Sequence, residues 1–107
     1  MLNRKNKKQL IISSEAKADL HDIFLYSLSN WGLKLADIYL KKIYKSMTML
    51  LNYPMAGKPK DNFFPGYRCL HSERHLILYC IIDDNIEIAR ILHENYQYQN
   101  KRIQEFD

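Results

Sequence analysis

The chain has 107 residues, of which 47% are hydrophobic and 26% are charged, and its formal net charge at pH 7 is +4. A chain of this length can bury one core without disulfides or metals, so we expect a single domain over residues 1–107. No apolar run approaches the roughly 20 residues that cross a bilayer, and the N-terminus lacks the apolar stretch of a signal peptide, so we expect a cytoplasmic protein without membrane contact.

The N-terminal part predicts a tail, a short strand and the start of a helix. Residues 1–8 form a basic tail. Residues 9–13 (Gln-Leu-Ile-Ile-Ser) are a β-like run. Ser13, Ser14 and Glu15 end this run, because a serine can cap a helix and a glutamate favours the positive helix N-terminus.

Two amphipathic helices follow, joined by a short corner. The first begins near Ala16, and the second stops at Asn52-Tyr53-Pro54. The apolar residues recur at helical spacing: Leu20, Ile23, Phe24, Leu28 and Trp31 in the first helix, and Ala36, Tyr39, Leu40, Ile43, Met47, Leu50 and Leu51 in the second. Because Ser29-Asn30-Trp31-Gly32 interrupts the pattern, we expect a helical hairpin that Trp31 closes.

A loop and three strands complete the predicted domain. Residues 54–66 hold all three prolines and are expected to form a loop. The aromatic pair Phe63 and Phe64 is expected to pin this loop to the core, because exposed neighbouring phenylalanines would lose favourable burial. Strands are expected at 67–71, 74–82 and 86–93, with a turn at 83–85.

Helices followed by a run of strands indicate an α+β fold. We expect the order β-α-α-β-β-β, with an N-terminal helical hairpin packed on a small antiparallel sheet. Residues 94–107 form a polar C-terminal segment, in which a short helix is expected around 101–106.

The cysteines and histidines predict neither a disulfide nor a metal site. A tight turn near Ser72-Glu73 would place Cys69 opposite about Leu76 rather than Cys80. The four histidines lack the spacing of a zinc site. We expect no metal and no cofactor.

Taken in order, these features resemble the RelE/ParE superfamily of bacterial toxins, and they are most similar to its ParE branch. In the first helix the resemblance lies in the stretch from Ala18 to Ile23 and in Tyr26. In the sheet it lies in the stretches from His75 to Tyr79 and from Arg90 to His93. The residues that correspond to the structural motif of the family are Leu20, Ile23, Trp31, Gly32, Pro54, Gly66 and Tyr67.

The resemblance implies a toxin whose sheet and hairpin form a groove for a ParD-like antitoxin, in a toxin–antitoxin hetero-oligomer. ParE-like members act on DNA gyrase and trap it on cleaved DNA. RelE-like members instead cut messenger RNA inside the ribosome. A third alternative is a degenerate toxin that retains only antitoxin binding. Fold alone cannot choose between these activities.

Two sets of residues follow from the alternatives. A nuclease would need a base, an acid and cations at one phosphate, and the candidates are Lys58, Lys60, Arg68, Arg74, His93 and Tyr96. A carboxylate at Glu94, directly after His93, would repel phosphate, so we favour a toxin without hydrolytic chemistry and therefore without catalytic residues. For contact with a target or antitoxin the candidates are Arg68, Tyr79, Arg90, His93, Tyr96 and Tyr98, with Arg68 and Arg90 expected to meet acidic antitoxin residues.

Overall fold

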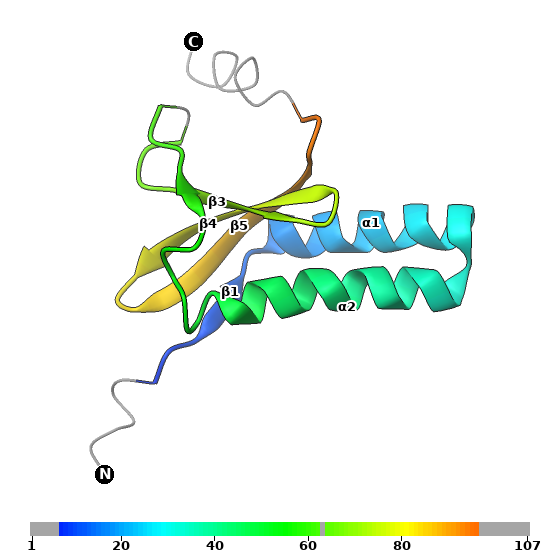
Figure 1. Ribbon diagram of the computed structural model, residues 1–107, viewed down its shortest axis with the longest axis horizontal. Coiled ribbons are helices and arrows are strands. Elements are labelled where there is room, and N and C mark those ends of the chain that lie inside the picture. The colour runs from blue at the N-terminus through cyan, green and yellow to red at the C-terminus, as the bar shows by residue number, and fades with distance from the viewer. Residues whose placement is uncertain (1–6, 63, 97–107) are drawn as a thin grey trace.

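The computed structural model describes residues 7–62 and 64–96. They form a five-stranded sheet and a helical hairpin that packs against it (Figure 1). The elements, in chain order, are β1 (Leu10–Ile12), α1 (Ser14–Trp31), α2 (Leu33–Met49), β2 (Lys58–Pro59), β3 (Arg68–Ser72), β4 (His75–Ile82) and β5 (Asn85–His93). The α+β prediction is confirmed, but the segment predicted as a loop contains the two-residue strand β2.

Some predicted features lie outside the described residues. They are the first six residues of the basic tail, Phe63 of the aromatic pair, and the helix expected around 101–106. Within the residues that the structure describes, neither helix has the length and apolar character needed to span a bilayer.

Each end of α1 is determined by one residue. The sequence predicted a serine cap at Ser13-Ser14, and the structure assigns it to Ser13, whose hydroxyl accepts a hydrogen bond from the Ala16 N–H at 2.9 Å. Gly32 ends the helix with a φ of +90°, a conformation that residues with a Cβ rarely adopt. This single glycine reverses the chain, and α2 therefore runs back along α1 toward the sheet (Figure 1).

The strand order in the sheet is β1-β5-β4-β3-β2. β1 is parallel to β5, and the other neighbouring strands are antiparallel. At the β4–β5 turn, Asp83 and Asp84 have positive φ, as expected for a turn. The β4–β5 pairing also shifts register between Leu78 and Tyr79, which marks a bulge on β5 around Ala89.

The predicted register of β3 against β4 was wrong by two residues. Cys69 lies opposite Leu78 and not opposite Leu76. The reason is that the turn consists of Glu73 and Arg74, so Ser72 already pairs with His75. Both cysteines are free thiols.

The core lies between the hairpin and one face of the sheet. Its buried members are Ala16, Leu20, Ile43, Met47, Leu50, Ile77, Tyr79, Ile86, Ile88 and Ile91. Tyr79 has no exposed surface; its hydroxyl donates to the Pro54 carbonyl at 2.6 Å and accepts from the Gly57 N–H at 2.8 Å. A Cβ at position 57 would lie 2.7 Å from the Tyr79 ring, which explains the glycine. We expected Tyr79 to contact a partner, but its burial gives it a structural role instead.

We expect Tyr79→Phe to lower the free energy of unfolding by about 1–3 kcal/mol, because the buried Gly57 N–H and the Pro54 carbonyl would lose their partner. Denaturant unfolding measures this as a lower midpoint with an unchanged m-value. Tyr53→Phe is the matched control, since Tyr53 is 64% exposed. Equal stability of the two variants would refute the role of the Tyr79 hydroxyl.

Candidate functional site

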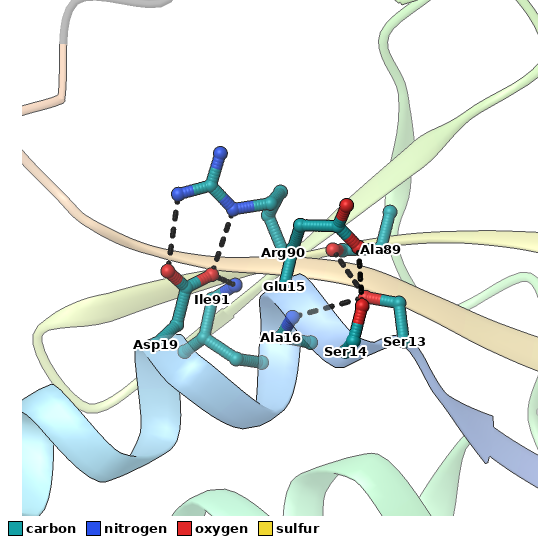
Figure 2. A network of polar contacts seen from close by, with 8 residues as sticks. All are labelled: Ser13, Ser14, Glu15, Ala16, Asp19, Ala89, Arg90 and Ile91. Carbon is teal, nitrogen blue, oxygen red and sulfur yellow. Dashed lines mark hydrogen bonds and ion pairs between the residues drawn. The ribbon is translucent and has the colours of Figure 1, made fainter.

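Arg90, the cation of the last family motif, is paired within the chain. Its Nε and Nη2 donate to the two carboxylate oxygens of Asp19 on α1, at 2.8 and 3.0 Å (Figure 2). The hydrogen bonds that Arg90 donates to Asp19 raise the pKa of Arg90, although burial partly opposes the rise. This bidentate geometry holds the guanidinium in one orientation. Arg90 therefore joins the last strand to the first helix.

Asp19 and Ser13 also form hydrogen bonds with backbone groups of β5 where β1 has ended and no longer pairs with it. The Ile91 N–H donates to the Asp19 carboxylate at 2.8 Å. Ser13 donates through its N–H to the Ile88 carbonyl at 3.0 Å and through its hydroxyl to the Ala89 carbonyl at 2.8 Å. Figure 2 shows the contacts of the Asp19 carboxylate and of the Ser13 hydroxyl in the first turns of α1. Helix cap and strand bulge thus form one polar network.

Arg68, the other predicted contact with antitoxin carboxylates, also has internal partners. Its Nε donates to the Gly57 carbonyl at 2.9 Å, and its Nη2 donates to the Met55 carbonyl at 3.3 Å. The guanidinium holds the loop between α2 and β2 against β3. Arg68 is therefore a structural residue in this conformation.

The predicted nuclease residues do not form one cluster. Lys58 and Lys60 line a hollow of about 360 Å³ beside β3. Arg74 and His93 line a different hollow, at the β3–β4 turn. Arg68 lies at the opposite end of β3 from that turn. The structure thus separates the cations that a nuclease would bring to one phosphate.

The segment after β5 starts beside His93. The Tyr96 N–H donates to the His93 carbonyl at 2.8 Å, and the Asn95 N–H donates to His93 Nδ1 at 3.1 Å. Tyr98, another predicted contact residue, lies outside the described residues.

Five rings contact one another in series between the hairpin and the end of β5. The centroid distances are 6.3 Å for Tyr26–Trp31, 5.8 Å for Trp31–Tyr39, 5.7 Å for Tyr39–His75 and 5.4 Å for His75–His93. With Asp22, Ile23, Ser27 and Arg74 they line a hollow of about 570 Å³, here called the aromatic hollow. Sequence reasoning named Trp31, Arg74 and His93 separately. It missed that Tyr26, Tyr39 and His75 join them, since these residues come together only through the β3–β4 register and the packing of α2.

Each of the two imidazoles in the aromatic hollow makes a hydrogen bond through Nδ1. Tyr39 Oη accepts from the Arg74 N–H at 3.1 Å and lies 2.7 Å from His75 Nδ1. The phenolic oxygen can donate to an unprotonated Nδ1 or accept from a protonated one, so this contact fits either tautomer of His75. His93 Nδ1 accepts from the Asn95 N–H, so the proton of neutral His93 is on Nε2.

Burial keeps His75 neutral over a wider pH range. Burial lowers the pKa of His75 from its ordinary value, and the neighbouring His93 lowers it further. Glu94 and Asp19 act in the opposite direction. Over the described part of the chain, no three His, Cys, Asp or Glu side chains lie close enough together to hold a metal ion.

Comparison with known proteins gives the chain relatives over nearly all of its helices and strands. Residues 10–98 match the family model described as the ParE toxin of a type II toxin–antitoxin system, parDE. The chain is 36% identical over 84 residues to "Toxin ParE1" of Caulobacter vibrioides, covering 78% of this chain and 86% of that protein. It is 28% identical over 85 residues to "Toxin ParE1" of Mycobacterium tuberculosis, covering 78% and 87%.

Solved structures share the fold at lower identity. A chain of the chromosomal ParDE system from P. aeruginosa has a TM-score of 0.72 at 24% identity, covering 80% of this chain and 95% of that one. A chain of the RelBE2 toxin–antitoxin complex from M. tuberculosis has a TM-score of 0.62 at 22% identity, covering 80% and 96%.

We expect Asp19→Ala to lower the free energy of unfolding by about 1–3 kcal/mol, because the Ile91 N–H and Arg90 would lose their acceptor. Asp19→Asn should cost less, since it keeps an oxygen for Ile91. The matched control is Asp37→Ala, which removes an exposed pair with Lys41 on α2 and should cost about 0.5 kcal/mol or less. Chemical denaturation compares the three variants. A loss for Asp19→Ala no larger than for Asp37→Ala would contradict the network.

We expect the protein to lose stability as pH falls from 8 to 5, in part through His75. The unfolded chain takes up this proton near the ordinary pKa of 6.5, whereas the folded protein takes it up at lower pH. The unfolded state therefore binds more protons in that window, and stability falls with pH. His75→Gln should flatten the profile of unfolding free energy against pH, whereas His21→Gln, at an exposed site on α1, should not. Equal slopes for wild type and His75→Gln would disprove this.

Proposed function

The chain belongs to the ParE toxin family of type II toxin–antitoxin systems, and on that premise we propose that it inhibits DNA gyrase by trapping the enzyme on cleaved DNA. We further propose that a ParD-like antitoxin neutralises it in the cytoplasm. The observation that carries the proposal is the family match itself, which spans every helix and strand from β1 to β5.

The site geometry supports a toxin that acts by binding rather than by hydrolysis. Cleavage of RNA needs a base, an acid and cations around one phosphate. Here the candidate cations line two separate hollows. The Arg68 guanidinium already donates hydrogen bonds to backbone carbonyls within the chain. Near His93, Glu94 lies 3.0 Å from His71 and 3.4 Å from Arg74. A carboxylate at this position opposes the approach of a phosphate.

Exposed apolar side chains on the hairpin support a protein partner. Leu25, Leu33 and Leu35 are 47%, 64% and 53% exposed. A large contiguous apolar patch marks an interaction site, and these three side chains are the kind of residue that such a patch on the hairpin would contain. The solved fold relatives come from toxin–antitoxin assemblies, and we propose the same kind of partner for this chain. Neutralisation would then be steric, with the antitoxin covering the surface that meets the target.

The test is a cleavage assay with purified chain, gyrase, supercoiled DNA and ATP, in which gyrase is denatured at the end. We expect linear DNA to accumulate with the chain and to disappear when the antitoxin is added first. A heat-denatured sample of the chain is the control. Unchanged supercoiling without linear DNA would contradict the proposal, and cleavage of mRNA in a translating extract by the same sample would assign the chain to the ribosomal alternative.

A further inference from the structure

The sheet has a second face, here called the open face, which points away from the core under the hairpin. Ile86 and Ile88 of β5 belong to that core, so the side chain of Glu87 between them points to the open face. Its cross-strand partners, Ile11 on β1 and Cys80 on β4, point the same way. These three side chains line a hollow of about 430 Å³, here called the open-face hollow.

The open-face hollow is acidic, although the chain as a whole has a net charge of +4. Glu15, from the first turn of α1, and Glu87 both line it. Arg90 is the one cation among its described lining residues, and the Asp19 carboxylate already pairs with that guanidinium at 2.8 Å. In the described part of the chain, no group forms a hydrogen bond or an ion pair with the Glu87 carboxylate. Glu87 is therefore available to a cationic group from a partner.

The rest of the wall is neutral and partly apolar. Burial is the main reason why the pKa values of the Tyr67 phenol and the Cys80 thiol are raised, and the Glu87 charge raises both as well. Both groups therefore stay protonated at neutral pH. Ile11, beside them, is 40% exposed. A carboxylate next to an aliphatic and an aromatic side chain suits a lysine or arginine, whose stem is apolar and whose head is charged.

Charge divides the open face into two ends, and it argues against nucleic acid at the β1 end. Lys58 pairs with Cys69 of β3 and, with Lys60, lines a separate hollow at the opposite edge of the sheet. Glu15 and Glu87, at the β1 end, would repel the phosphates of a nucleic acid. A protein segment that carries a basic side chain is therefore the ligand that fits this end.

We propose that the open-face hollow is a contact site for DNA gyrase, and that it takes a lysine or arginine side chain of the gyrase protein. The cationic head pairs with Glu87 and Glu15, and the stem packs against Ile11 and Tyr67. This inference rests on the proposed function, because gyrase is the partner. Glu15 belongs to α1, so an antitoxin on the hairpin would reach the rim of the hollow, which agrees with steric neutralisation.

The experiment measures the concentration of the chain that gives half-maximal linear DNA in the gyrase cleavage assay. We expect Glu87→Gln to raise this concentration about fivefold or more, and Glu87→Lys to raise it further, because a lysine there repels the gyrase cation. Glu73→Gln is the matched control, since Glu73 is exposed and lies outside the hollow. Unchanged thermal unfolding, and a Kd for the antitoxin encoded beside the chain that stays within about twofold, confirm that the fold is kept.

Two readings identify the occupant of the hollow. The first is the sign of the Glu87→Lys effect, because a new lysine attracts DNA and repels a basic side chain, so potency would rise if the hollow faced DNA. The second is cross-linking of the trapped complex with a carbodiimide, which joins a carboxylate to a lysine in contact with it. A bond from Glu87 to a gyrase lysine supports the inference. A bond to Lys101 of the same chain would overturn it in favour of that occupant.

The outcomes separate the inference from the proposed function. Wild-type potency of both Glu87 variants would overturn the inference and leave the proposed function standing. Higher potency of Glu87→Lys would overturn it in favour of nucleic acid, and weaker antitoxin binding at wild-type potency would assign the hollow to the antitoxin. Failure of the unmodified chain to trap gyrase would overturn both.

Discussion

The carboxylate of Asp19 joins the helical hairpin to the last strand of the sheet, and the arrangement of the binding surface depends on this contact. It accepts from both the Arg90 side chain and the Ile91 N–H, where β5 has run past the end of β1. An unpaired N–H and an unpaired charge at this place would destabilise the fold. Because Ile23 and Tyr26 follow Asp19 by one and two turns, the same contact places the α1 wall of the aromatic hollow opposite His93.

The arginines of the sheet and of the β3–β4 turn differ in role because they differ in nearby hydrogen-bond acceptors. The sequence alone does not distinguish them. Arg68 and Arg90 lie in the sheet, where backbone carbonyls and a carboxylate are within reach. Arg74 lies in a turn, and its side chain is mostly exposed. His75 and His93 each form a hydrogen bond through Nδ1. The more accessible of these groups therefore lie at the turn and at the end of β5, beside the Glu94 carboxylate.

Local signals were sufficient to predict the helices, a serine cap at the start of α1, the Gly32 corner and the α+β class. The rest depends on contacts between distant residues. A two-residue strand such as β2 has no periodicity to detect, and the bulge near Ala89 is visible only once β4 is paired with β5. Arg90 and Asp19 are 71 residues apart, so nothing local identifies them as partners. The aromatic hollow was missed for the same reason, since four separate segments form it: α1, α2, the β3–β4 turn with the start of β4, and the end of β5.

A structure of the chain bound to gyrase on cleaved DNA tests the central claim most directly. The account predicts a lysine or arginine of gyrase within hydrogen-bond distance of the Glu87 carboxylate, its stem against Ile11 and Tyr67, and an intact Asp19–Arg90 pair. The contrary result would be DNA or solvent at Glu87, with the gyrase protein bound elsewhere on the chain.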